Sequence, residues 1–226
     1  MIAARAVEKS FERKRVLRGV DLDVERGGFV LVTGPNGSGK TTLLRVIAGL
    51  AAPDRGDIRV DVERAELGFL AHEPLVYREL TALENLDLYG RLYHVPERRE
   101  RIGMLLERFG LWDARGERVG TYSRGMQQRL ALCRVLLHEP SLLLLDEPYA
   151  GLDEEGTTLL DGELEGRRGR VTFVVATRSV PTGTAKCRIV SAESTNRSIA
   201  GSVSFALSSS RRSLRASAMT SLKYVM

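Results

Sequence analysis

Residues 34–41 constrain the fold of this chain more than any other segment. They read Gly-Pro-Asn-Gly-Ser-Gly-Lys-Thr and satisfy the pattern G-x-x-x-x-G-K-[ST] of a phosphate-binding loop. The apolar run 29–33 precedes them and a helical pattern at 41–50 follows, so the loop joins a predicted strand to a predicted helix. A chance glycine-rich turn is the alternative, but such a turn requires neither the lysine nor these flanks.

The residue types of this loop suit a nucleoside polyphosphate. Glycines let backbone N–H groups turn towards a β-phosphate, and the helix N-terminus adds a positive dipole end. Lys40 supplies a positive charge for the β- and γ-phosphates, and the Thr41 hydroxyl is placed to ligate Mg²⁺. We predict that ATP is bound here by Gly34, Pro35, Asn36, Gly37, Ser38, Gly39, Lys40, Thr41 and Thr42.

A second apolar run, residues 142–145, ends in two carboxylates, Asp146 and Glu147. Open α/β sheets bind their ligands at the carboxyl ends of the strands, where these side chains are expected. We predict that Asp146 holds Mg²⁺ and that Glu147 orients and deprotonates the attacking water as general base. Such a pair alone is typical of a solvated acidic turn; together with a phosphate-binding loop it predicts nucleotide hydrolysis.

The strand patterns indicate a parallel sheet. Continuous apolar runs at 29–33, 142–145 and 171–176 are typical of parallel strands buried on both faces. Residues 20–24 alternate apolar and acidic side chains, as a half-exposed edge strand does. Because helical patterns separate these strands, we expect an α/β fold of the P-loop NTPase (RecA-like) kind, with a three-layer core.

The helical patterns indicate an insertion in that core. Residues 123–138 carry an apolar stripe at helical spacing, and Ser123 is an N-cap residue opening the helix. Residues 81–120 are mostly helical, with breaks at Pro96 and Gly110. We therefore expect a helical subdomain inserted at about residues 81–140.

The positive charge of the chain is concentrated in residues 179–226. The formal net charge is +5, yet this segment carries seven basic side chains and one acidic one, which leaves residues 1–178 at −1. The body gives no electrostatic reason to expect nucleic acid as a partner. Twelve serines and fading apolar periodicity predict a weakly ordered Ser/Arg-rich tail, with short strands at 189–190 and 202–207. Contact with an anionic membrane surface is the alternative role for this tail.

The composition excludes several classes of protein. No apolar stretch reaches the roughly 18 residues that a membrane span needs, and residues 1–10 show no signal peptide. Cys133 and Cys187 do not make a disulfide framework, so nothing indicates an oxidising compartment. We expect Cys133 to be a small core residue.

Beyond these two motifs, the order of further motifs in residues 1–178 resembles the ATP-binding subunits of ABC transporters. Residues 121–129, Thr-Tyr-Ser-Arg-Gly-Met-Gln-Gln-Arg, look like the signature motif of that family. Residues 151–153 look like its D-loop, and residues 80–86 look like the start of its helical subdomain. The resemblance implies one ABC-type ATPase domain at 1–178.

The resemblance also implies roles for four further residues. Phe11 stands where the family stacks an aromatic ring on adenine, with a core aromatic as the alternative. Ser123, Gly125 and Asp153 match the signature and D-loop, which contact the ATP held by a second subunit. The implied assembly is a homodimer or a paired ABC ATPase, joined head to tail.

Three departures from the family pattern bear on activity. Where the family has a glutamine that senses Mg²⁺ and water, the candidates here are His72 and Glu73. The signature has Arg124 and Met126 where glycine and glutamine are commonest. Arg178 stands in place of the histidine that contacts the γ-phosphate. The composition break begins at the next residue, so residues 179–226 are either frame-shifted or fused sequence, or a divergent C-terminus.

The function that the resemblance implies is ATP binding and hydrolysis powering an ABC membrane exporter. Separate transmembrane permease subunits would dock on residues 75–77, which places the protein peripherally at the cytoplasmic face of the membrane. Residues 79–86 and 122–128 most resemble the heme-exporter ATPases of cytochrome c maturation. Two alternatives stay open: an ATP-binding protein whose hydrolysis is impaired by Arg178, and a soluble ABC ATPase not linked to transport.

Overall fold

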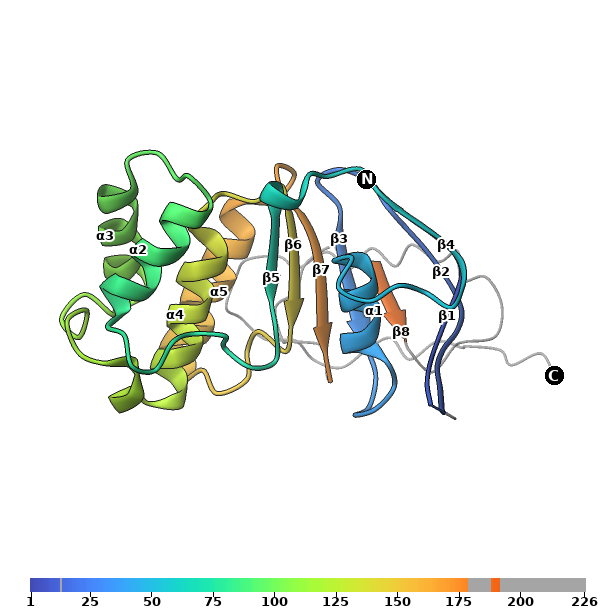
Figure 1. The fold of residues 1–226 in the computed structure, drawn as a ribbon, viewed down its shortest axis with the longest axis horizontal. Helices are drawn as coiled ribbons and strands as arrows, with labels where there is room; N and C mark the ends of the chain where they lie inside the picture. Colours follow the sequence, from blue (N-terminus) through green and yellow to red (C-terminus); the bar gives the residue numbers. More distant parts are fainter. Residues whose placement is uncertain (13, 179–187, 192–226) are drawn as a thin grey trace, which may run out of the picture.

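A five-stranded parallel sheet forms the centre of the computed structural model, which describes residues 1–12, 14–178 and 188–191. The strand order is β5-β6-β7-β3-β8 (Figure 1). The strands are β3 (Phe29–Thr33), β5 (Leu67–Leu70), β6 (Leu142–Asp146), β7 (Thr172–Thr177) and β8 (Arg188–Ser191). All neighbouring strands pair in parallel, which confirms the parallel sheet predicted from the continuous apolar runs.

A second, antiparallel sheet covers one face of the parallel sheet. It consists of β1 (Ile2–Phe11), β2 (Lys14–Val24) and β4 (Arg55–Val60) in the order β2-β1-β4. The alternating residues 20–24 lie in β2 at the edge of this sheet, as predicted. Helix α1 (Lys40–Ile47) lies between the two sheets (Figure 1).

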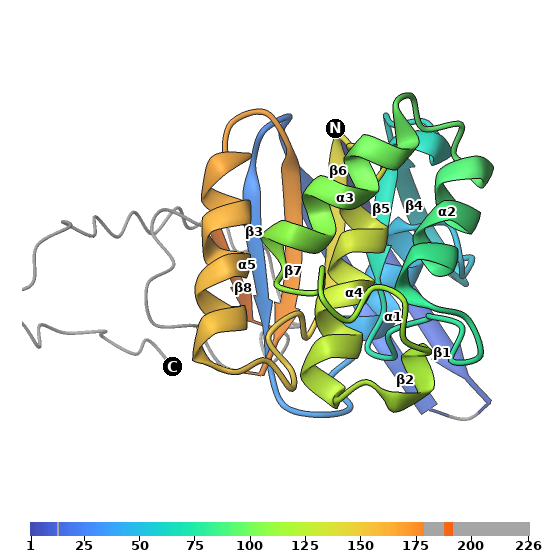
Figure 2. The same ribbon diagram turned by 90° about the vertical axis from the view of Figure 1, so that its left-hand side faces the viewer.

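Helices cover the opposite face of the parallel sheet. They are α2 (Ala82–Leu92), α3 (Arg98–Arg108), α4 (Arg124–Leu136) and α5 (Glu154–Gly166), with short 3₁₀ turns at Arg64–Glu66 and Val119–Thr121. Figure 2 shows α4 and α5 next to the sheet, with α3 crossing on their outer side. Helices α2, α3 and α4 occupy the region predicted as the inserted subdomain.

Local hydrogen bonds fix where these helices begin. The Ser123 hydroxyl accepts a hydrogen bond from the backbone N–H of Met126 at 3.2 Å, which confirms the predicted N-cap of α4. Thr81 and Glu84 form a reciprocal capping box at the start of α2. One turn later, the fully buried Asn85 side chain hydrogen-bonds to both backbone groups of Tyr77 and to the Thr81 carbonyl, so it anchors the segment entering the subdomain.

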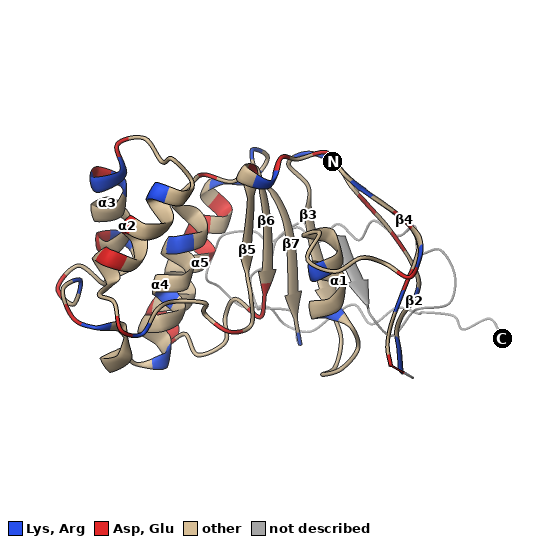
Figure 3. Ribbon diagram, viewed as in Figure 1, with Lys and Arg blue, Asp and Glu red and all other residues tan. Residues whose placement is uncertain are grey.

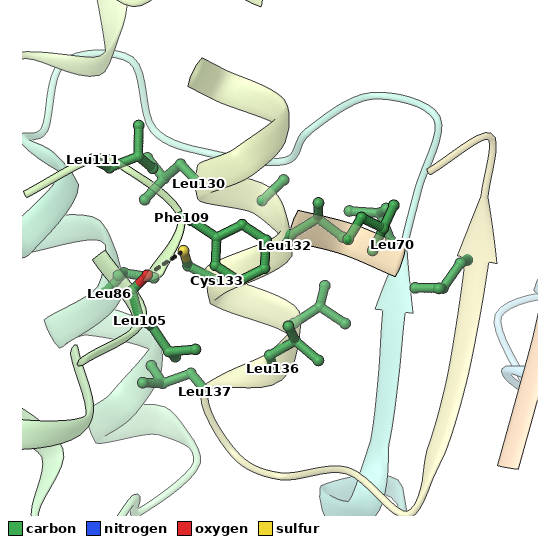
Figure 4. Packing of buried hydrophobic residues seen from close by; sticks show 14 of the residues in the cluster. Leu70, Leu86, Leu105, Phe109, Leu111, Leu130, Leu132, Cys133, Leu136 and Leu137 are labelled. Carbon is green, nitrogen blue, oxygen red and sulfur yellow. Dashed lines mark hydrogen bonds between the residues drawn. The ribbon is translucent and has the colours of Figure 1, made fainter. Parts of the chain in front are cut away.

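The parallel sheet is buried on both faces because its strands alternate between two cores. Leu143 and Leu145 of β6 pack with the helical side, while Leu142 and Leu144 pack with α1 and the antiparallel sheet. On the helical side, Cys133 is fully buried and its thiol lies 3.6 Å from the Leu105 carbonyl (Figure 4). Cys133 is therefore a core residue, as predicted, and its burial raises the pKa of the thiol.

The body departs from the sequence prediction in several places. The helix expected at 41–50 ends at Ile47, because Gly49 adopts a left-handed conformation with φ of 68°. Strands β1, β4 and β5 and helix α5 were not predicted; β1 and β4 lack a continuous apolar run. Strand β4 in particular is mostly exposed and reads Arg-Gly-Asp-Ile-Arg-Val, so its strand state depends on pairing with β1.

The sheet continues past the predicted tail boundary at residue 178. The short strand predicted at 189–190 is confirmed by β8, which pairs with β3. Residues 179–187 and 192–226, with the predicted strand at 202–207 and the predicted weak order of the tail, lie outside the described residues. Among the described helices, none has the length and apolarity needed to cross a membrane.

Candidate functional site

Three segments that follow strands of the parallel sheet meet in one cleft. They are residues 36–39 after β3, Asp146 and Glu147 at the end of β6, and Arg178 after β7. Figure 3 shows the acidic end of β6 at this edge of the sheet. The cleft has a volume of about 420 Å³ and is lined by Lys14, Val16, Asn36, Gly37, Ser38, Gly39, Lys40, Thr41, Thr42, His72, Asp146, Glu147 and Arg178.

The loop 34–39 directs Lys40 into this cleft. Gly37 and Gly39 have φ of 78° and 97°, a left-handed conformation that glycine adopts without strain. The Lys40 side chain is 7% exposed, and its Nζ donates hydrogen bonds to the carbonyls of Gly34 at 2.7 Å and Pro35 at 3.2 Å. Gly34 and Pro35, both predicted to bind nucleotide, thus hold the lysine rather than line the cleft.

Thr41 and Asp146 meet although 105 residues separate them. The Thr41 hydroxyl donates a hydrogen bond to Asp146 Oδ2 at 2.7 Å. Asp146 is 1% exposed, and its Oδ1 has no hydrogen-bond partner among the described residues. A buried carboxylate oxygen without a partner beside a hydroxyl is a donor set that suits a hard cation such as Mg²⁺.

Glu147 lies between two cations. Its Oε1 is 3.7 Å from Lys40 Nζ and 3.8 Å from Arg178 Nε, while its Oε2 accepts a hydrogen bond from the Arg178 backbone N–H at 3.3 Å. The backbone of Glu147 is left-handed, with φ of 49°, and its N–H donates to the Ala176 carbonyl of β7 at 2.8 Å. A strained non-glycine backbone held by the neighbouring strand aims this carboxylate into the cleft.

The lining of the cleft distinguishes between His72 and Glu73, the two candidates for the position of the family's glutamine. His72 lines the cleft and Glu73 does not, so of these two candidates His72 is the one beside the acidic residues. Lys14 and Val16 were not predicted: they lie two residues apart on β2, and Val16 reaches the loop close to Gly39. Because residues two apart on a strand share a face, the sequence could indicate that Lys14 and Val16 lie on one side of β2. That β2 passes close to the loop is decided by the tertiary structure.

Phe11 does not line the cleft. It ends β1, pairs in register with Lys14, and is 48% exposed, so the alternative of a core aromatic is wrong. Lys9 lies over its ring, with Nζ 5.7 Å from the ring centroid. Its stacking on adenine stays a prediction.

Ser123, Gly125 and Asp153 do not line the cleft of their own chain. Their segments lie close together: a Cβ on Gly125 would come within 2.9 Å of the Gly151 carbonyl, and Nη2 of Arg129 on α4 donates to both carboxylate oxygens of Asp153, at 2.8 and 2.7 Å. Asp153 caps α5, and hydrogen bonding from the Gly156 N–H, together with Arg129, lowers the pKa of its carboxyl. The signature and D-loop segments therefore form one joined surface apart from the cleft.

Residues 75–77 form part of the outer surface. Leu75 is 51% exposed and Tyr77 53% exposed, and the Leu75 carbonyl accepts a hydrogen bond from the Tyr89 hydroxyl. Leu75 has a left-handed φ of 50°. Two apolar side chains are thus presented on a fixed loop between β5 and α2.

Comparison with known proteins gives a family. Residues 17–150 match the ABC transporter family. The daunorubicin resistance ATP-binding protein DrrA3 of Streptomyces coeruleorubidus is 40% identical over 187 residues, which cover 78% of this chain and 59% of DrrA3. The uncharacterized ABC transporter ATP-binding protein YxlF of Bacillus subtilis (strain 168) is 40% identical over 162 residues, 69% of this chain and 55% of YxlF. The chain thus spans less than two thirds of these two relatives.

A cytochrome c biogenesis protein and a solved structure also match. The cytochrome c biogenesis ATP-binding export protein CcmA of Xanthomonas campestris pv. campestris (strain 8004) is 40% identical over 168 residues, 71% of this chain and 78% of CcmA. A dimeric post-hydrolysis structure of the ATP-binding cassette MJ0796, bound to ADP and Pi, has 29% identity and a TM-score of 0.70. That match covers 79% of this chain and 88% of MJ0796, and it confirms the P-loop NTPase fold.

Proposed function

Because the chain belongs to the family of ABC transporter ATP-binding domains, we propose that it hydrolyses ATP to power a membrane exporter. The observation that carries this proposal is the meeting of Lys40, Thr41, Asp146 and Glu147 in one cleft. The cleft offers cations for phosphates, a hydroxyl–carboxylate pair for a metal ion and a carboxylate for water. These are the parts that phosphoryl transfer to water requires.

The roles follow from the chemistry of each group. Lys40 would exchange its two carbonyl partners for the β- and γ-phosphates, and the loop N–H groups would bind the β-phosphate. Glu147 would take a proton from water as the water oxygen attacks the γ-phosphorus and the bond to the bridging oxygen breaks, giving ADP and phosphate. Thr41 and Asp146 would hold Mg²⁺, which supplies charge neutralisation at the phosphates.

A head-to-tail dimer explains why Ser123, Gly125 and Asp153 lie away from the cleft. In that assembly each ATP is held between the loop of one chain and the signature surface of the other. The exposed N-cap of α4 suits an anion from a partner because helix N-termini attract negative charge. MJ0796 is dimeric, which supports this assembly for the present chain.

Permease subunits would dock on residues 75–77, where Leu75 and Tyr77 are exposed. Docking there would hold the chain peripherally at the cytoplasmic face of the membrane.

For the cargo, heme remains our proposal from motifs 79–86 and 122–128, and CcmA supports it. DrrA3 supports drug export equally, so export is the broader statement. A soluble ABC ATPase not linked to transport is the alternative that co-purification with a membrane protein would exclude.

A second candidate, ATP binding with slow hydrolysis, is favoured by one specific observation. Arg178 stands beside Glu147 in the cleft where the family has a histidine. Arginine keeps a permanent charge where a histidine could accept and release a proton, so ATP binding should persist while the attacking water is positioned poorly. Displacement of the reacting groups by about 1 Å can cost on the order of a hundredfold in rate.

The test compares the parent chain with Glu147→Gln, using Glu107→Gln, an exposed change on α3, as control. We expect Glu147→Gln to keep Mg-ATP binding, measured by thermal shift, while phosphate release falls by at least about a hundredfold. It should also elute as a dimer with Mg-ATP. Unchanged phosphate release would reject Glu147 as the base, and a monomer throughout with intact binding would reject the dimer.

A further inference from the structure

The carboxylate of Glu147 is held from two sides by groups of different chemistry. Its Oε2 accepts the backbone N–H of residue 178, a bond that any non-proline residue at that position would supply. Its Oε1 faces Lys40 Nζ at 3.7 Å and Arg178 Nε at 3.8 Å. We call Lys40, Glu147 and Arg178 the Glu147 clamp.

Nucleotide binding should affect the two cations of the clamp, Lys40 and Arg178, differently. Lys40 is 7% exposed at the start of α1, so an incoming γ-phosphate would draw its ammonium away from Glu147. Arg178 is 60% exposed and is anchored through its own backbone to the same carboxylate. With nucleotide bound, Arg178 would therefore remain as the cation beside Oε1.

We assign the attacking water to Oε1, the carboxylate oxygen that does not accept the backbone N–H of Arg178. Oε2 already accepts one hydrogen bond, and neither cation is within hydrogen-bonding distance of Oε1, so there is room beside it. A guanidinium is planar, permanently charged and cannot accept or relay a proton. At 3.8 Å from Oε1, its charge attracts the carboxylate without contributing to proton transfer, and so restrains the carboxylate from turning towards the attacking water.

We propose that Arg178 is a positioning residue that restrains Glu147 and so sets a slow basal rate of ATP hydrolysis. This proposal rests on the proposed function, and it adds the charge at residue 178 to the loss of a histidine as a cause of the low rate. Neutralising the side chain should free Oε1 for water while the backbone bond to Oε2 keeps the carboxylate in place.

The experiment uses the full chain with Arg178→Gln, Arg178→Lys and the control Arg59→Gln. Arg59 is 81% exposed on β4 and pairs with Asp61 outside the cleft. We expect Arg178→Gln to raise kcat about fivefold, the size expected of one partly exposed ion pair, with KM changed less than about threefold. Arg178→Lys, which keeps the charge, should stay near the parent, and so should Arg59→Gln.

The salt dependence of kcat is a second measurement, which a purely structural role of Arg178 would leave unchanged. At saturating Mg-ATP, raising NaCl from about 50 to 500 mM should increase the kcat of the parent and leave Arg178→Gln unchanged, because screening weakens exposed charge pairs. An Arg178→Gln kcat at or below the parent value, or equal salt responses, would overturn the restraint. If neither parent nor variants show a thermal shift with Mg-ATP, it is the proposed function that fails instead.

Discussion

Replacement of Lys40 by alanine tests the nucleotide site directly. In the parent, Mg-ATP at about 100 times its Kd should stabilise the fold by about 2.7 kcal/mol. For a chain of this size, each kcal/mol raises Tm by about 2–4 °C, so the expected shift is about 5–11 °C. The measurement is a thermal melt with and without Mg-ATP.

The structure sets the size of the loss. Lys40 Nζ already makes two hydrogen bonds to loop carbonyls, so two comparable charge-assisted bonds to phosphate oxygens are within its geometry. At about 1.5–3 kcal/mol each, their removal weakens binding by at least about a hundredfold. At the same ATP concentration the stabilisation then falls below about 0.5 kcal/mol, a Tm shift of at most about 2 °C.

Arg45→Ala is the matched control, because Arg45 is an exposed cation on the same helix and does not line the cleft. It should keep the parental shift. If Lys40→Ala folds and its Tm still rises with Mg-ATP as in the parent, the phosphate-binding role of residues 34–41 is wrong.

Three further outcomes are expected. Asn85→Ala should lower the free energy of unfolding by about 2–4 kcal/mol in denaturant melts, because three hydrogen bonds of a fully buried side chain are lost. A change below about 0.5 kcal/mol would refute the anchoring role. Burial lowers the pKa of His138, so the stability contributed by its neutral form is full above about pH 6.5 and is lost as the pH falls through the lowered pKa. His138→Phe should therefore flatten the dependence of Tm on pH between about 7.5 and 5. An unchanged slope would contradict this. Arg178→His should bind ATP as the parent does and release phosphate several-fold faster at pH 8, an incomplete rescue because the following residues also depart from the family; equal rates would show that the site tolerates arginine.

Features with short-range causes were predictable from the sequence. The glycines, Lys40 and Thr41 lie within eight residues, so the motif carries its own geometry. The strand β3 and the N-cap Ser123 were found for the same reason: an apolar run and a capping hydroxyl act on their immediate neighbours. The family order of the motifs then gave the fold, because that order specifies how the pieces connect.

The tertiary structure alone decided which distant residues meet. Strand order β6-β7-β3 brings Asp146 to Thr41 and places Arg178 beside Glu147, although no local pattern encodes either distance. Lys14 and Val16 enter the cleft because β2 passes the loop at Gly39. Strand β4 shows the same limit, since its polar sequence becomes a strand through hydrogen bonds to β1. Propensity and periodicity act over a few residues, whereas pairing across a sheet is settled by burial of both faces and by backbone hydrogen bonds between segments far apart in the chain.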